Sequence, residues 1–418
     1  MQLARLVCPI FATPIFVSPI FVSPIFVVPC AAAQDTVSAR ARRIHHSAIV
    51  IDAHEDTPQR FLDENYDVGS TDPHDLDFIS LDKARAGNLG ALFFSVCVDG
   101  KTGQAKRAFD LIDSVYEQAA RHPDRMVMSY SADDIERAHR EHKMAALLGI
   151  EGGDAIENDL RLLGSFYRLG ARYMTLTHVS TTDWADSSGD IDNPAVTHHD
   201  GLTGFGKQVV LEMNRLGMIV DVSHVSDKTF WDVIATSKAP IIASHSSARA
   251  LVASPRNLTD DMLRGVAKNG GVVNVAFPSN FLDEGFNQGA YSQHQRLLAA
   301  VEDYKAKQAA DGRPATPDET QSFSLDWLTR NPIPRPPLTA LIDHIDHVAK
   351  IAGLDHVGLG SDFNGANFFP QEMDSAADLP RITQALLDRG YSPDNIRKIL
   401  GGNMLRVLRA VERSRQLR

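Results

Sequence analysis

The stretch Ala48-Ile-Val-Ile-Asp-Ala-His-Glu-Asp56 carries the pattern on which the fold prediction rests. A short apolar run, typical of a buried strand, leads directly into His54 and Asp56. The same pattern returns at five further places, where the polar residue is Glu151, His178, His224, His245 or Asp362. The chain therefore repeats one structural unit whose far end carries ionisable side chains.

Eight apolar runs predict strands, and helical segments lie between many of them. The predicted strands are Ala48–Asp52, Ala91–Val98, Met144–Ile150, Tyr173–Thr177, Met218–Val222, Pro240–Ser244, Gly271–Ala276 and His356–Gly360. The clearest amphipathic helices are expected at Gly204–Leu216, Asp260–Lys268 and Leu338–Ala352. Alternating strands and helices indicate a parallel sheet, and eight repeats favour an α/β fold of the (β/α)8 TIM-like barrel type over an open sheet.

The composition agrees with one soluble barrel domain, predicted over residues 34–418. The chain has 418 residues, of which 43% are hydrophobic and 23% are charged. A barrel with insertions reaches this length. The formal net charge of −11 argues against a nucleic-acid partner, which would normally bind a basic surface.

The first 33 residues predict a signal peptide. Arg5 precedes an apolar run that ends in the small residues Cys30-Ala-Ala-Ala33. Proline at every fifth position makes this run a poor membrane anchor, so we expect an exported bacterial protein, periplasmic or secreted, with no stable membrane anchor. An uncleaved anchor is the alternative, and a lipid anchor on Cys30 is disfavoured by Pro29. Cleavage leaves Cys97 as the only cysteine, which we interpret as a small core residue.

Two long segments exceed a minimal barrel. Residues 180–203 are polar and predict a long loop on the active-site face. Residues 278–337 contain a charged helical segment, Gln293–Ala310, followed by a proline-rich tail. Loops of this length usually have a function, so a substrate lid or an oligomer contact is the hypothesis for both.

The polar strand ends predict a metal centre. In such barrels the C-terminal ends of the strands meet at one face, where several buried ionisable groups need compensation. His54 and Asp56 are two residues apart on an extended chain, so both side chains point the same way. With Glu151, His224 and His245 they form a donor set that suits zinc. Five ligands exceed the three of a mononuclear site, which predicts a second ion bridged by Glu151 and a hydrolytic reaction.

Several motifs resemble the membrane (renal) dipeptidase family, zinc-dependent peptidases of the amidohydrolase-like barrel superfamily. Most amidohydrolases carry His-x-His in the first strand, whereas this chain has the dipeptidase form, His54-Ala-Asp56. The resemblance extends from about Ile51 to Leu408. Further matching motifs are Gly149-Ile-Glu-Gly-Gly153, Asp221-Val-Ser-His224, Ser244-His-Ser-Ser-Ala-Arg249, Pro255-Arg-Asn-Leu258 and Gly358-Leu-Gly-Ser-Asp-Phe363.

The resemblance implies two zinc ions and a dipeptide substrate. His54 and Asp56 would bind one ion, His224 and His245 the other, and Glu151 would bridge them. By the same resemblance Asp362 would take a proton from the bridging water and pass it to the leaving amine. His178 would stabilise the oxygen of the tetrahedral intermediate. Arg256 would pair with the C-terminal carboxylate of the substrate. Some family members accept a C-terminal D-residue, and a homodimer is also implied.

Alternatives remain open at this point. Asp362 could cap a helix, and Arg256 could form a local ion pair. Asp221 and Glu55 are interpreted as residues that support the ligands. At the level of function, the alternatives are another binuclear hydrolase on the same barrel (an acyl-amino-acid hydrolase, a deaminase or a lactonase) and a non-catalytic exported binding protein.

Overall fold

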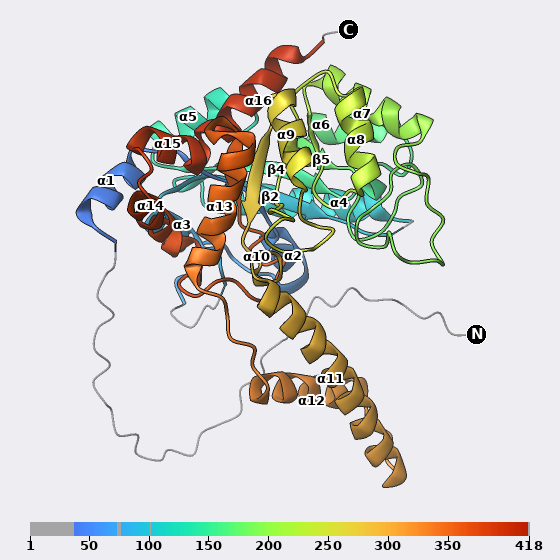
Figure 1. Cartoon of the computed structure of the whole chain (residues 1–418). Coiled ribbons are helices and arrows are strands. Elements are labelled where there is room, and N and C mark those ends of the chain that lie inside the picture. Colours follow the sequence, from blue (N-terminus) through green and yellow to red (C-terminus); the bar gives the residue numbers. More distant parts are fainter. Residues whose placement is uncertain (1–36, 73–76, 101, 417–418) are drawn as a thin grey trace.

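Eight parallel strands close into a ring in the computed structural model, which describes residues 37–72, 77–100 and 102–416 (Figure 1). The ring runs β1-β2-β4-β5-β6-β7-β8-β9, and the pairing of β1 with β9 closes it. The strands are β1 Val50–Glu55, β2 Leu89–Cys97, β4 Met144–Glu151, β5 Ala171–Thr175, β6 Ile219–Asp221, β7 Ile242–Ala243, β8 Val272–Ala276 and β9 Val357–Gly360. All eight predicted strands are present, and the predicted (β/α)8 barrel is confirmed.

The strands are apolar on both faces because the barrel has two hydrophobic cores. Phe93 and Leu147 belong to the cluster inside the ring, whereas their neighbours Leu92 and Leu148 belong to the cluster under the outer helices. This division follows from the alternation of side chains along a strand. The inner cluster also contains Tyr173, which lies below the C-terminal ends of the strands.

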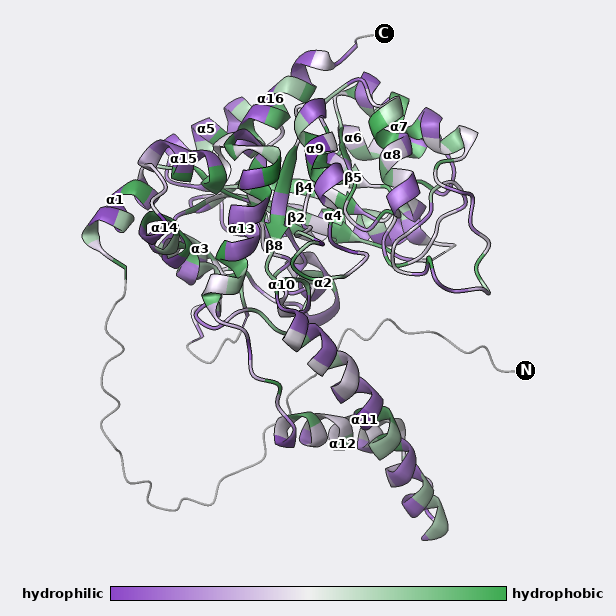
Figure 2. Ribbon diagram, viewed as in Figure 1, coloured by the Kyte–Doolittle hydropathy of each residue, from purple (hydrophilic) through white to green (hydrophobic). Residues whose placement is uncertain are grey.

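Helices surround the ring and carry their apolar sides toward it (Figure 2). They are α1 Ala39–His46, α2 Thr57–Glu64, α3 Leu81–Ala86, α4 Gln104–Arg121, α5 Ala132–Arg140, α6 Leu160–Arg168, α7 Gly204–Leu216, α8 Asp227–Thr236, α9 Asp260–Asn269, α13 Leu338–Ala352, α14 Leu379–Asp388, α15 Pro393–Arg397 and α16 Asn403–Ser414. The three helices expected from the sequence are α7, α9 and α13. Helix α7 begins at a Thr203 cap and ends at Gly217, which has φ 77°.

The strands differ from the prediction in number and in their bounds. Strand β3, Met126–Met128, was not predicted; it is three residues long and pairs only with the first part of β4. Strand β6 has three residues where five were expected. Strand β7 has two residues where five were expected. Its shortness has a local cause, because the amide of Ser244 donates to Asp221 Oδ1 over 2.8 Å instead of continuing the ladder.

The second long segment forms a helical arm. After β8 the chain enters α10, Ser279–Leu282, then α11, Glu284–Ala310, and returns through α12, Pro317–Arg330. Figure 1 shows α11 and α12 projecting from the barrel on the side where β8 ends. Helix α11 begins nine residues before the predicted Gln293, and α12 was not expected. Tyr304 and Phe323 stack at a centroid distance of 4.4 Å and join the two helices.

The predicted loop 180–203 is confirmed as a segment without helix or strand. It is held by its own hydrogen bonds, such as those from the amides of His199 and Gly201 to Asp186. The predicted signal peptide, residues 1–33, lies outside the described residues. Within the described part of the chain, no helix combines the length and apolar character needed to span a membrane.

We predict that buried His45 makes folding stability depend on pH. Its Nε2 bonds the Gly87 carbonyl and its Nδ1 bonds the Thr383 hydroxyl, and burial lowers its pKa from 6.5 to about 4. The unfolded chain therefore binds a proton that the folded chain excludes as the pH falls below 6.5. Stability contributed by this group is intact above pH 6.5 and is lost as the pH falls toward 4.

His45→Gln retains a donor for Gly87 and removes the titration. Between pH 7.5 and pH 5, urea unfolding should show about 2 kcal/mol less loss of stability in the variant than in the wild type. His294→Gln, in the exposed part of α11, is the control and should behave like the wild type. Equal pH dependence in all three proteins would contradict the prediction.

Candidate metal centre

The predicted site residues meet at the C-terminal face of the barrel. His54 lies near the end of β1, and Glu151 is the last residue of β4. The others follow β5, β6, β7 and β9 in the loops that leave the barrel; these are His178, His224, His245 and Asp362. All of them except His178 are buried.

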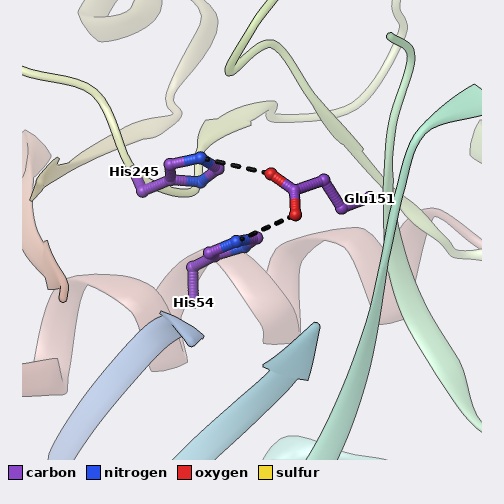
Figure 3. A group of neighbouring side chains, drawn as sticks. All are labelled: His54, Glu151 and His245. Atoms are coloured by element: carbon purple, nitrogen blue, oxygen red, sulfur yellow. Dashed lines mark ion pairs between the residues drawn. The ribbon is translucent and has the colours of Figure 1, made fainter. Parts of the chain in front are cut away.

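The two oxygens of Glu151 face different imidazoles, and Figure 3 shows the stacked rings of His54 and His245 on the same side of the carboxylate. Its Oε2 is 3.3 Å from His54 Nε2. Its Oε1 is 3.0 Å from His224 Nε2 and 3.4 Å from His245 Nε2. Each carboxylate oxygen thus faces a different set of histidines. Ser95 Oγ donates to Oε2 over 3.0 Å and fixes the carboxylate from below.

Asp56 and Asp362 form the second side of the centre. Asp56 Oδ2 is 3.5 Å from His54 Nε2, and ligand atoms of His54, Asp56 and Asp362 lie within 4.8 Å of one another. A Cβ at Gly365 would come within 2.3 Å of both carboxylates, so this glycine leaves the space into which they point. Burial and the neighbouring Asp56 raise the pKa of Asp362 well above its usual range. Such closely spaced carboxylates favour a proton or a cation between them.

His245 has a defined tautomer. Ser244 Oγ is 2.6 Å from Asp221 Oδ2 and 2.9 Å from His245 Nδ1. Since the carboxylate only accepts, the hydroxyl hydrogen points to Asp221, and His245 Nδ1–H donates to the hydroxyl oxygen. The lone pair of Nε2 therefore faces Glu151. Burial also lowers the pKa of His245 and of His224 well below the usual range, which keeps both imidazoles neutral.

Tyr173 holds His54 from inside the barrel. Its hydroxyl is 2.8 Å from His54 Nδ1, which leaves His54 Nε2 turned toward the two carboxylates. This Nε2 is buried and has no hydrogen-bond partner among the described residues. The Tyr173 ring fits because residue 149 is glycine: a Cβ there would lie 1.9 Å from Tyr173 Cζ.

His178 stands at the edge of the centre. Its Nε2 is 4.0 Å from Glu151 Oε1, and its Nδ1 is 3.8 Å from both Asp99 Oδ2 and Cys97 Sγ. Cys97 is only half-buried and lines the site, so its interpretation as a core residue was wrong.

Arg256 is half-buried and contacts the backbone of His245. Its Nη2 donates to the His245 carbonyl over 3.1 Å, and the guanidinium lies 5.4 Å from the Phe281 ring centroid. No carboxylate of the described residues forms an ion pair with it, so the alternative of a local ion pair finds no support. Asp362 does not cap a helix, since the next helical turn after β9 begins at Ala376.

Tyr173, Ser95 and Asp99 also contact the site and were not predicted. Each lies on or directly after a strand, but its contact with the site depends on the register between neighbouring strands, which no motif reveals. Asp221, expected to support the site, contacts His245 through Ser244 and also accepts a hydrogen bond from Thr175. Two site residues also have left-handed backbones, His224 with φ 67° and Asp362 with φ 58°, a conformation that costs energy and is common at functional sites.

These groups fit a metal centre. The buried and unpartnered Nε2 of His54, the neutral His224 and His245, and the acidic Asp56, Glu151 and Asp362 converge on one place. Imidazole and carboxylate donors at this spacing suit a divalent transition metal. The hydrogen bonds to Tyr173 and Ser244 orient the imidazoles as metal ligands require.

Comparison with known proteins decides the family. The family model for membrane dipeptidases, peptidase family M19, matches residues 38–417. The chain belongs to this family. It is a metallopeptidase that hydrolyses peptide bonds, and the alternative of a non-catalytic binding protein is set aside.

Individual M19 relatives agree over nearly the whole chain. Dipeptidase 3 of Homo sapiens is 32% identical over 388 residues, which cover 90% of this chain and 68% of the relative. The crystal structure of PvdM from Pseudomonas aeruginosa, described as a probable dipeptidase, has a TM-score of 0.73 and 26% identity and covers 90% of this chain and 98% of that one. A metallo peptidase from Rhodobacter sphaeroides, solved with a phosphinate mimic of L-Ala-D-Ala, shares the fold with a TM-score of 0.68 and 24% identity over 87% of this chain and 99% of that one.

We predict that Tyr173→Phe weakens metal binding while leaving the fold intact. The substitution keeps the ring beside Gly149 and removes only the hydroxyl that orients His54. Loss of such a supporting bond typically lowers metal affinity by about 10- to 100-fold. Competition with a coloured chelator measures the affinity, and Tyr304→Phe on α11 is the matched control. Unchanged affinity in Tyr173→Phe would show that the hydroxyl does not position the ligand.

Proposed function

We propose that this M19 peptidase is a dipeptidase that uses two zinc ions. His54 and Asp56 would hold one ion, His224 and His245 the other, and Glu151 would bridge them. The position of the Glu151 carboxylate carries this proposal, because its two oxygens face the two sets of imidazoles separately. When bound, such a pair of ions polarises a carbonyl and lowers the pKa of water.

The surrounding residues supply binding and proton transfer. Asp362 is the group that would take the proton of the attacking water and deliver it to the leaving amine. His178, next to Glu151, would donate a hydrogen bond to the oxygen of the tetrahedral intermediate. Arg256 has guanidinium donors beyond those bound to His245 and Ser246, and would bind the C-terminal carboxylate of the substrate. Because Arg256 contacts His245, a carboxylate bound there lies close to the centre, which suits a short peptide such as a dipeptide.

The family assignment replaces the alternatives of an acyl-amino-acid hydrolase, a deaminase and a lactonase. A lactone has no carboxylate for Arg256 to bind, so this residue favours the dipeptide. Dipeptides ending in an L- and a D-residue both present that carboxylate, and L-Ala-L-Ala and L-Ala-D-Ala should be compared directly. Export to the periplasm or medium, from the predicted signal peptide, and a homodimer complete the proposal.

Arg256→Ala tests the role of the substrate carboxylate. We expect kcat/KM for Ala-Ala to fall about 100-fold, since a charge-assisted contact of about 3 kcal/mol is lost. Turnover of Ala-Ala amide, which lacks the carboxylate, should change by less than about threefold. Arg264→Ala on exposed α9 is the control. Equal losses on both substrates would contradict the carboxylate role.

Metal analysis tests the centre itself. The purified enzyme should contain close to two zinc ions per chain, and a chelator should remove metal and activity together. Glu151→Gln should lower the zinc content, because it removes the proposed bridge. Asp362→Asn should retain zinc better than Glu151→Gln yet lower kcat by at least about 100-fold, since proton transfer is lost. Full activity of the chelated enzyme would overturn the proposal.

A further inference from the structure

A second cavity lies at the opposite end of the barrel from the metal centre. It has a volume of about 310 Å³ and is bounded by the starts of β2 and β4, at Leu89 and Met144. Because all strands are parallel, this is the N-terminal face, whereas the metal ligands occupy the C-terminal face. The cavity therefore cannot be an extension of the dipeptide site.

The cavity is lined by basic side chains and by no acidic one. Five of its eleven lining residues are Arg, Lys or His: Arg85, Arg125, His139, His142 and Lys143. Three of the five are Arg or Lys and none of the lining residues is Asp or Glu, whereas the whole chain has 53 Asp and Glu residues against 42 Lys and Arg residues. The basic groups come from three separate places, namely α3, the segment before β3, and the end of α5 with the turn that follows it.

One of the three permanent cations, Arg85, has no ion-pair partner among the described residues, and the carboxylates that pair with the other two lie outside the lining. Among the described residues, Arg85, His139 and His142 have no carboxylate within ion-pair distance. Arg125 pairs with Asp82, and Lys143 Nζ is 3.7 Å from Glu141, and both of these carboxylates lie outside the lining of the cavity. Burial and, second to it, the nearby His142 lower the pKa of His139, so this imidazole is neutral at pH 7 and offers an oxyanion an N–H donor rather than a charge.

The backbone holds His142 at the rim despite a conformational cost. Helix α5 ends in a turn in which His142 has φ 56°, and the Lys143 amide donates to the Ala138 carbonyl over 2.9 Å. This position after a helix normally carries glycine or asparagine. Here it places an imidazole beside the cavity.

We propose that this cavity binds a small compound carrying a phosphate group. Basic side chains that converge from three segments onto one pocket suit a multiply charged oxyanion better than a single carboxylate. The volume exceeds that of a phosphate ion and leaves room for an organic group. Inorganic phosphate and phosphate monoesters both present the charged phosphate oxygens that these side chains would bind.

The test is titration calorimetry on the zinc-loaded enzyme at constant ionic strength. Inorganic phosphate, pyrophosphate and glycerol phosphate are the probes, and chloride is the reference anion. We expect saturable binding of at least one phosphate compound. Comparing the affinities for inorganic phosphate and glycerol phosphate then shows whether the site prefers free phosphate or a phosphate ester. Arg85→Gln should weaken this binding about tenfold, whereas Arg140→Gln, an exposed arginine of α5 outside the cavity, should not.

His142→Asn provides a second variant that the fold tolerates. Asparagine accepts the left-handed backbone, so the thermal midpoint should be retained while the affinity falls. Peptidase kcat/KM should be unchanged in all three variants, which separates this site from phosphate bound at the metal centre. Three outcomes would overturn the proposal. They are an absence of saturable binding, equal binding in Arg85→Gln and Arg140→Gln, and binding that only a dipeptide inhibitor abolishes.

Discussion

The structure depends on a buried carboxylate, Glu151, placed where the strands of a barrel end. A carboxylate removed from water needs compensating partners, and here they are imidazoles from three other strands together with a serine hydroxyl. Because each partner follows a different strand, the ligand geometry is fixed by the closure of the ring. The barrel is thus the frame that sets the spacing of the donors, and the loops carry the groups that would meet the substrate.

Hydrogen bonds from residues on the strands orient the imidazoles of His54 and His245. Asp221 accepts hydrogen bonds from Thr175 on β5 and from Ser244 after β7, and so joins three neighbouring strands. The same carboxylate sets the tautomer of His245 through Ser244. Tyr173 acts in a similar way on His54 from the inner core. These residues therefore hold neighbouring strands together and orient the site histidines at the same time.

Much of this arrangement could be predicted from the sequence. Apolar runs revealed the eight strands, and the common direction of parallel strands implied that His54, Glu151, His224, His245 and Asp362 would meet. The sequence could not reveal contacts that depend on register, such as Tyr173 with His54 across Gly149. It also left β3 unpredicted, because a three-residue strand has no periodicity. Helix α12 was overlooked although Thr316-Pro-Asp-Glu319 carries the capping box with which the helix begins. Cys97 was misassigned for a related reason: an apolar run does not show which of its last residues faces the site.

The helical arm has a consequence for the evolution of the protein. The chain returns to the barrel close to where it leaves, since Gln293 Nε2 of α11 donates to the Asn331 carbonyl beyond α12 and Gly289 lies beside Ile333. A segment anchored in this way can lengthen, shorten or be exchanged without altering the register of β8 and β9. The arm is therefore a module on which related enzymes can diversify their contacts while the hydrolytic centre is inherited unchanged.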